Sequence, residues 1–463
     1  MLFIVALITL ILTGVAGYLG KLKVKDTKDF IRAGNGFGVV GVTSMLMGSI
    51  IGGASTVGTA QMAYKHGIAA VWFITGVALA SVILGLIYSK LVEDKKSETL
   101  PQIIGNTYGK KARTCSSFLL SMGMFVHING QIIACMALFT AIFGIDINIT
   151  ALIVVGLLIV YVVFGGFWGS TMVGAMKTIL LYGTSIVCGV VLIFKFGAGK
   201  EIIDFFPKEP WFNLFSDGVT EDLALGFSTV VGILSTQTYF QAIMAGKNSK
   251  VSRISSFIVA FLVLPIGIIC TMIGMYMRIH FPAIRPSEAF PLFLVKYLNP
   301  VMGGVSIATV LISSIATGAG LTLGIATMFA KDIYKESINV KATDKNQLFV
   351  MRFVIVLIGV ATLFIVTNNK DSMILDWGFL SMVFRAVPIF VPTVFALFFK
   401  NKIHKDAGLY SILSGTAASI IWISLGFDSV SSIYVGIAFN IVVILSVSKY
   451  KNKICNKNDI KSK

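Results

Sequence analysis

The chain has 463 residues, of which 56% are hydrophobic and 13% are charged, and its mean hydropathy is +0.88. This composition excludes a soluble globular domain and predicts an integral membrane protein. The net charge of +17 would suit a nucleic-acid-binding protein, but the basic residues gather in alternate loops between apolar segments. Their placement argues against nucleic acid as a partner and for contact with membrane lipids.

Charged and Pro/Gly-rich loops divide the sequence into thirteen apolar segments. Each is close to the ~20 residues that a helix needs to cross hydrocarbon, so we expect an all-α protein with about 13 transmembrane helices. The expected spans are 1–20, 38–62, 67–89, 115–141, 148–166, 171–196, 222–246, 254–278, 300–330, 347–367, 374–399, 407–426 and 430–448. The first segment has no basic residue before it and no clear cleavage site, which predicts a retained helix rather than a signal peptide.

The distribution of Lys and Arg predicts an orientation in the cell membrane. Assigning the loops alternately to two sides places 27 of these residues on one side and 8 on the other. By the positive-inside rule, the amino terminus is then outside and the carboxyl terminus is in the cytoplasm.

The expected span 38–62 contains a stretch that does not suit a lipid-facing helix. From Gly48 to Thr59 it holds four glycines and four hydroxyl side chains. Freed backbone groups cost several kcal/mol each in hydrocarbon, so such a break fits only beside a cavity. Breaks of this kind bind cations and solutes in secondary transporters, which makes solute transport the leading hypothesis.

Two basic residues fall deep inside expected spans, Lys177 in the sixth and Arg385 near the centre of the eleventh. An ionisable group at that depth indicates a functional site, yet no carboxylate falls at a similar depth to pair with either. Lys177 could release and regain a proton during transport, because burial disfavours the charged amine. Alternatively, both cations could face a water-filled cavity and attract an anionic solute, or both could simply hydrogen-bond helix carbonyls.

The cysteines and histidines are scattered. Their spacing supports neither a disulfide framework nor a metal site, and no span holds a cluster with catalytic spacing, so we do not expect an enzyme. His127, in the fourth span near Asn129 and Gln131, could form an interhelical hydrogen bond or relay protons.

A series of motifs resembles the sodium:solute symporter family. They are DFIRAGNGFG (Asp29 to Gly38), Ala63-Tyr64 with Gly67, GGFWG (Gly165 to Gly169), Gln241 with AGK (Ala245 to Lys247), Ala289-Phe290-Pro291-Leu292 and KDIYK (Lys331 to Lys335). The resemblance covers most of the chain and implies a secondary transporter with a LeuT-type core of inverted five-helix repeats. The implied parts are 1–37 as an extra helix and loop, 38–196 and 222–399 as the repeats, 407–448 as two further helices, and 449–463 as a cytoplasmic tail.

Each implied repeat would begin with a broken helix, which is the expected pointer to a binding site. The first break is at Gly52-Gly53 and the second at Gly232, within VVGILSTQ. For Gly232 alone, close helix packing is the other interpretation.

The resemblance also implies a sodium site, built from the carbonyls of Gly48, Ile51 and Ser313 and from two side chains at positions 316 and 317. Ala316 supplies no hydroxyl there, whereas Thr317 does. Serines of a second sodium site in the family correspond to Ala319 and Gly320, so we expect that second site to be absent.

A family aspartate and glutamine in the sixth span correspond to Gly174 and Lys177 here. Two unit charges about 4 Å apart repel by about 4 kcal/mol at an effective dielectric constant of about 20. A charged Lys177 would therefore compete with Na⁺. Coupling to Na⁺ is what the family implies, with proton-coupled or Na⁺-independent transport through Lys177 as the alternative. An alternative from a different functional class is a membrane sensor or scaffold that has the same fold but does not transport a solute.

The expected solute is a small organic molecule, with an anionic one as a possibility. Ala54 and Ser55 stand where sugar-transporting relatives have polar contacts, and Gly232 replaces an aromatic gate, which argues against a sugar. The other candidates for the solute cavity are Gln131, Thr236, Gln237 and Arg385. For Gln131, Thr236 and Gln237, hydrogen bonds that hold neighbouring helices together are an equally good interpretation. The sequence predicts neither the identity of the solute nor the oligomeric state.

Overall fold

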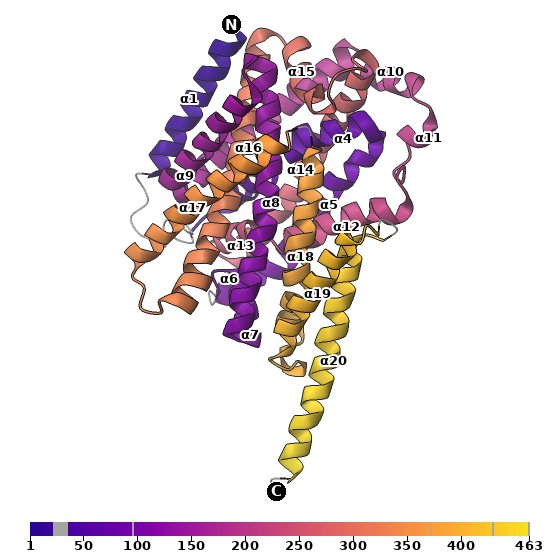
Figure 1. Ribbon diagram of the computed structural model, residues 1–463. Coiled ribbons are helices and arrows are strands. Elements are labelled where there is room, and N and C mark those ends of the chain that lie inside the picture. Colours follow the sequence, from indigo (N-terminus) through magenta and orange to yellow (C-terminus); the bar gives the residue numbers. More distant parts are fainter. Residues whose placement is uncertain (22–35, 95–96, 371, 428–429, 462–463) are drawn as a thin grey trace.

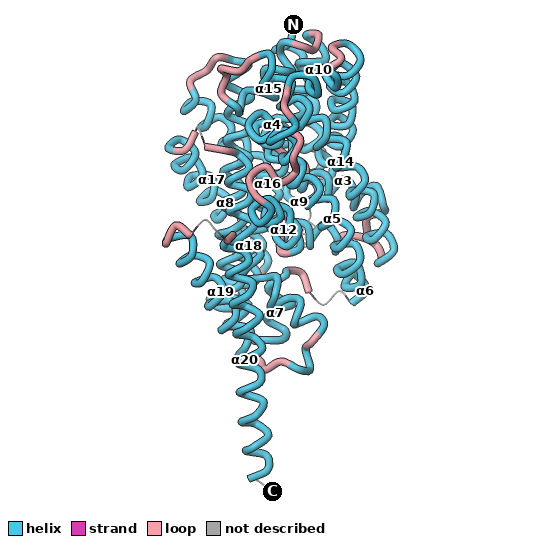
Figure 2. Tube along the Cα trace, turned by 90° about the vertical axis from the view of Figure 1, so that its right-hand side faces the viewer, coloured by secondary structure: helices cyan, strands magenta, loops and turns pink. Residues whose placement is uncertain are grey.

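The computed structural model describes residues 1–21, 36–94, 97–370, 372–427 and 430–461. These residues form helices joined by loops, with no strand among them (Figure 2). The all-α prediction is thus confirmed. The two ends of the chain lie at opposite ends of the molecule, and the last helix extends beyond the rest (Figure 1). Most of the DFIRAGNGFG motif lies outside the described residues.

The longer helices follow the apolar segments of the sequence. They are α1 (Leu2–Lys21), α3 (Val39–Ile50), α5 (Val71–Ile87), α8 (Lys110–Phe143), α9 (Ile147–Val190), α12 (Val219–Leu234), α14 (Ser249–His280), α16 (Pro300–Met328), α17 (Asp344–Asn368), α18 (Ile374–Phe398), α19 (Ala407–Ser424) and α20 (Ser432–Lys461). Shorter helices connect them: α4 (Thr59–His66), α6 (Leu91–Asp94), α7 (Leu100–Tyr108), α10 (Ala198–Phe205), α11 (Lys208–Trp211), α13 (Gln237–Met244) and α15 (Ala289–Lys296).

Within the described residues, nine helices are long and apolar enough to cross a membrane, and a bent pair makes ten. The predicted count of thirteen is therefore not confirmed. One boundary was wrong, because residues 167–170, expected to separate two spans, continue the single helix α9. Glycine costs a helix only about 1 kcal/mol relative to alanine, so the glycine-rich GGFWG segment can remain helical. The side chains of residues 164–173 are not described.

The first predicted break is present. Helix α3 ends at Ile50, the next three residues form bends and a turn, and a π-helix, η1 (Ala54–Gly58), leads into α4. Glycine is required at the break because its neighbours are so close. A β-carbon at position 52 would lie 2.4 Å from Gln131 Oε1, and one at position 53 would lie 2.3 Å from the β-carbon of Ala134.

The second break is displaced from its predicted position. Gly232 lies inside α12, and the chain bends by 51° between α12 and α13, at Ser235 and Thr236. Thr236 is extended, with φ −102° and ψ 121°. A β-carbon at position 232 would come within 2.4 Å of Met382 Sδ, so this glycine serves the close packing of α12 against α18.

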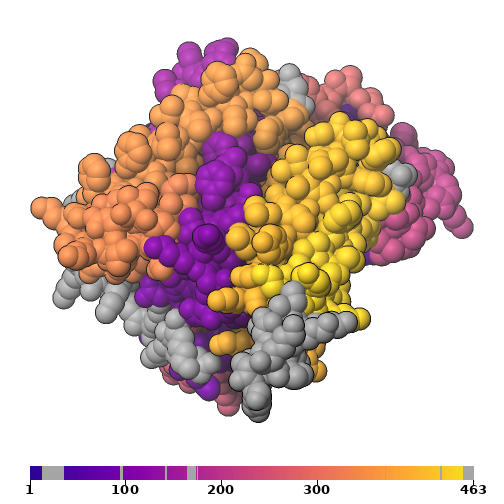
Figure 3. Space-filling view, turned by 60° about the horizontal axis from the view of Figure 1, so that its bottom comes forward, coloured from indigo at the N-terminus to yellow at the C-terminus, as the bar shows by residue number. Residues whose placement is uncertain are grey.

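The helices pack in two interlocking sets. Helix α14 packs on α3, α4 and α5, and α12 packs on α5, while α8 packs on α16 and α18, and α16 packs on α9. The broken segments lie between the two sets, since α3 contacts α9 and α16, and α12 contacts α18. At the lower end of the molecule, purple residues of α7 and α8 lie between orange residues and the yellow C-terminal helices (Figure 3).

Candidate functional site

The side chain of Lys177 reaches from α9 to the first break. Its amine donates hydrogen bonds to the carbonyl oxygen of Gly48 (2.6 Å), the carbonyl oxygen of Ser313 (2.9 Å) and the hydroxyl of Thr317 (3.0 Å). An ammonium group has three N–H donors, and all three are used here. The residue is only 1% exposed. The lysine therefore joins three helices, α3, α9 and α16, at one point.

Hydroxyl groups of α16 complete this arrangement. The carbonyl oxygen of Ile51 accepts hydrogen bonds from Ser313 Oγ (2.9 Å) and Thr317 Oγ1 (3.1 Å). The structure thus brings together Gly48, Ile51, Ser313 and Thr317 as the resemblance implied, with Lys177 among them. Ala316 does not take part in this arrangement. It packs with Ile312 against Leu10 and Tyr161.

The four oxygens do not fit a sodium ion beside a charged lysine. A hard cation needs several oxygen ligands in direct contact. The amine already contacts three of these oxygens, and the Ile51 carbonyl is occupied by two hydroxyl donors. No carboxylate in the described part of the chain pairs with the amine.

The positions expected for a second sodium site carry no hydroxyl, as the sequence requires. Ala319 and Gly320 are buried, and the carbonyl oxygen of Gly320 accepts a hydrogen bond from Thr238 Oγ1 at 3.0 Å. This contact ties α16 to α13.

Arg385 is fully buried between the second break and α8. Its Nη1 donates to Thr236 Oγ1 (2.7 Å), its Nη2 to Met382 Sδ (2.8 Å) and its Nε to the carbonyl oxygen of Ser381 (3.3 Å). The side chain of Tyr239 also faces the guanidinium. Among the described residues, no carboxylate forms an ion pair with Arg385.

Other candidates for the solute cavity lie at or beside the first break. The amide N–H of Gly53 donates to Gln131 Oε1 at 2.8 Å, and Gln131 Nε2 lies 3.1 Å from His127 Nε2. His127 and Gln131 belong to the same helix, so the interhelical hydrogen bond considered for His127 is not formed with Gln131. Ser55 Oγ donates to the carbonyl oxygen of Ile50 at 3.1 Å, and Ala54 is buried beside it.

Gln237 points away from the other candidates. Its Oε1 accepts from the amide of Leu100 (2.8 Å), and its Nε2 donates to the carbonyl oxygen of Glu98 (3.1 Å). The side chain therefore links the second break to the segment that begins α7.

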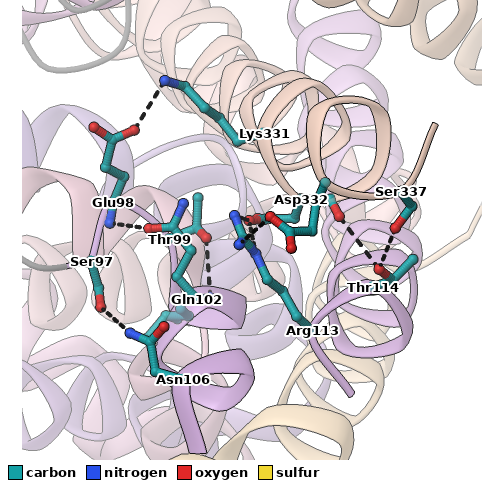
Figure 4. Close-up of polar contacts among 12 residues, drawn as sticks. Ser97, Glu98, Thr99, Gln102, Asn106, Arg113, Thr114, Lys331, Asp332 and Ser337 are labelled. Atoms are coloured by element: carbon teal, nitrogen blue, oxygen red, sulfur yellow. Dashed lines mark hydrogen bonds and ion pairs between the residues drawn. The ribbon is translucent and has the colours of Figure 1, made fainter. Parts of the chain in front are cut away.

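That segment belongs to an ion-pair cluster at the lower end of the molecule, formed by Glu98, Arg113, Lys331, Asp332 and Glu336 (Figure 4). Arg113 contacts Asp332 and Glu336 at 2.8 Å each, and Lys331 contacts Glu98 at 3.1 Å. The side chain of Asp332 is fully buried. Asp332 belongs to the KDIYK motif, to which the sequence assigned no structural role. A buried aspartate at the end of a long apolar helix was the available signal.

Known proteins match most of this chain. The model of the sodium:solute symporter family matches residues 30–415. The high-affinity proline transporter PutP of Bacillus subtilis is 20% identical over 450 residues, covering 93% of this chain and 94% of the relative. The uncharacterized symporter YwcA of the same organism is 24% identical, covering 90% and 84%. A sodium/proline symporter of Staphylococcus aureus is 21% identical, also covering 90% and 84%.

Solved structures show the same fold. A Na⁺-coupled sialic acid symporter in a substrate-bound, outward-open state superposes with a TM-score of 0.79 at 16% identity, covering 97% of this chain and 98% of that one. The nucleobase-cation-symport transporter Mhp1 has a TM-score of 0.60 at 12% identity, covering 92% and 94%. The fold is thus of the LeuT type, with two broken helices. The chain belongs to the sodium:solute symporter family and is a multi-pass secondary transporter.

Proposed function

We propose that this transporter moves a small organic solute by alternating access, and that the charged amine of Lys177 takes the place of a coupling cation. The observation that carries the proposal is the set of three hydrogen bonds from Lys177 Nζ to Gly48, Ser313 and Thr317. These groups belong to a broken helix and to a helix that packs on it. A positive charge there holds the two together.

Protonation of Lys177 would control this link. A charged amine has three donors, whereas a neutral amine has two and carries no charge, so loss of the proton weakens the contacts to the carbonyl oxygens. The break at residues 51–53 could then separate from α16. Binding and release of a proton would thereby be tied to the conformational cycle, in place of binding and release of Na⁺.

The remaining expectations fit this proposal. The protein would lie in the cell membrane with its amino terminus outside, which places the ion-pair cluster and the carboxyl-terminal end of α20 on the cytoplasmic side. The repeats would be 38–196 and 222–399, each beginning near one of the two breaks. The second buried cation, Arg385, favours an anionic solute.

The coupling ion can be tested in proteoliposomes that enclose a pH-sensitive dye. Small organic solutes, including proline and sialic acid, are added with a pH gradient alone or a Na⁺ gradient alone. We expect solute-dependent proton entry in the unaltered protein and none in Lys177→Gln. Lys195→Gln is the matched control, because Lys195 is an exposed lysine just beyond the end of α9.

Two outcomes contradict the proposal. One is solute accumulation driven by a Na⁺ gradient at equal pH on both sides. The other is proton entry that persists unchanged in Lys177→Gln.

A further inference from the structure

The guanidinium of Arg385 lacks strong acceptors. It carries five N–H donors and a charge that cannot be removed. Its partners in the described residues are a threonine hydroxyl, a carbonyl oxygen of its own helix at 3.3 Å, a thioether and the side chain of Tyr239. None of these carries a negative charge. A buried charge without a counter-charge is costly, so its retention indicates a partner that comes from outside the chain.

Met382 lies directly against the guanidinium. Its sulfur, a weak acceptor, lies 2.8 Å from Arg385 Nη2. The same side chain covers Gly232, where a β-carbon would come within 2.4 Å of the sulfur. Methionine is flexible and unbranched, so it can turn aside when a stronger acceptor enters.

His127, on helix α8, carries a buried N–H donor without a partner in the described residues. Gln131 Oε1 accepts from Gly53, so Gln131 Nε2 must be the donor toward His127 Nε2. His127 Nε2 is then an acceptor, and the ring proton is on Nδ1. This N–H is buried and has no partner in the described part of the chain.

His127 of α8 and Arg385 of α18 lie at neighbouring levels of the contact between these two helices. A β-carbon at Gly123, one turn before His127, would lie 2.8 Å from Arg385 Cγ. A β-carbon at Gly378 would lie 3.7 Å from His127 Nδ1, so a glycine leaves space in front of this donor. Ser235 Oγ, beside Thr236 at the second break, is also buried and unpartnered in the described residues.

The groups gathered here include a guanidinium and an unpartnered imidazole N–H, and no carboxylate in the described residues pairs with either. From this imbalance we infer that the transported solute is a monocarboxylate whose carboxylate binds the guanidinium of Arg385, displacing Met382, with the Nδ1–H of His127 as a further donor. A single guanidinium balances a single carboxylate, because the amine of Lys177 is engaged with Gly48, Ser313 and Thr317. The inference rests on the proposed transport function and names its class of solute.

Thermal unfolding of the purified full-length protein tests the inference without any gradient. The probes are acetate, propionate, lactate, pyruvate and benzoate, each compared with its primary amide at the same pH and ionic strength. We expect at least one acid to raise the unfolding temperature and its amide to have no effect. In Arg385→Gln, the acid concentration needed should rise by about tenfold to a hundredfold, since a charge-assisted contact is lost. Arg352→Gln, a change at an exposed arginine of α17, should respond as the unaltered protein does.

The inference is overturned if no acid in the series stabilises the unaltered protein, if the amides stabilise it equally, or if Arg385→Gln keeps the full response. The comparison of acid with amide needs no variant, so misfolding of Arg385→Gln would not obscure the result. Failure of proton coupling through Lys177 would leave the preference for acids intact. Conversely, proton coupling without a preference for acids would overturn only the present inference.

Discussion

Gly48 of α3 and Gly174 of α9 meet without a side chain between them. A β-carbon at Gly48 would lie 3.0 Å from Gly174 Cα, and one at Gly174 would lie 2.7 Å from the carbonyl oxygen of Ser44. Lys177 follows Gly174 by three residues and so lies on the same face of α9, one turn further along. The close approach of the two backbones is what allows the Lys177 amine to reach the carbonyl oxygen of Gly48 at 2.6 Å.

Replacing Gly174 by alanine should therefore disturb the Lys177 contacts. The added methyl group must push α9 away from Ser44, and overpacking of this kind costs about 1–3 kcal/mol. We expect a lower unfolding temperature for Gly174→Ala in detergent. Gly183→Ala is the control in the same helix, since a β-carbon there meets nothing within 4 Å. Equal unfolding temperatures for the two variants would refute the prediction.

Removing the amine should expose the oxygens to sodium. In Lys177→Gln, the carbonyl oxygens of Gly48 and Ser313 and the hydroxyl of Thr317 lose their charged donor. We expect NaCl to raise the unfolding temperature of this variant above its value in KCl at the same concentration, and to leave the unaltered protein indifferent to the choice of salt. Adding Thr317→Val to Lys177→Gln should remove the effect. A sodium response in the unaltered protein would be evidence against the prediction.

The buried member of the ion-pair cluster should be sensitive to loss of its partner. Arg113→Gln leaves the fully buried carboxylate of Asp332 without its arginine, and breaking a buried pair in this way costs about 3–5 kcal/mol. Arg285→Gln is the matched control, because Arg285 pairs with Glu288 at an exposed position, where such pairs contribute about 0–1 kcal/mol. Chemical or thermal unfolding should separate the two variants clearly. Similar losses of stability in both would contradict this assignment.

Gln237 should hold the start of α7 in place. In Gln237→Leu, the amide of Leu100 and the carbonyl oxygen of Glu98 lose their partners. We expect faster hydrogen exchange in residues 97–108, measured by mass spectrometry, with little change in α17. Gln347→Leu serves as control, since Gln347 is also buried but bonds only within its own segment. Unchanged exchange in 97–108 would show that Gln237 does not restrain this region.

The sequence predicted those features of the site that depend on local composition. The glycines and hydroxyls between Gly48 and Thr59 predicted the first break, and the lack of carboxylates at the depth of Lys177 and Arg385 predicted that neither would form an ion pair. Gly232 was misleading because a glycine in an apolar helix has the same local pattern whether it ends the helix or allows a neighbour such as Met382 to approach. The break lies instead at Ser235 and Thr236, where Thr236 contacts Arg385 of α18, and a local sequence pattern carries no information about such a contact.

The sequence also did not predict which polar residues pair with each other over long distances along the chain. Gln237 suited either the cavity or an interhelical hydrogen bond, and the sequence did not identify residues 98–100 as the partners of its amide. Arg113 and Asp332 are separated by 219 positions, and neither has a local feature that identifies the other. Pairings of this kind follow from the packing of α8 against the π-helix Phe329–Ile338 that follows α16, and only the three-dimensional arrangement reveals them.

Thr236 and Gln237 are consecutive residues with contacts in opposite directions. Thr236 Oγ1 accepts from Arg385, while the Gln237 side chain holds the segment before α7. The peptide unit between them is planar and rigid, so any reorientation of Thr236 turns Gln237 with it unless rotation about the intervening backbone bonds absorbs the motion. One peptide plane therefore lies between the contact of Thr236 with Arg385 and the contacts of Gln237 with residues 98–100. A change of backbone conformation at this plane would alter both sets of contacts together.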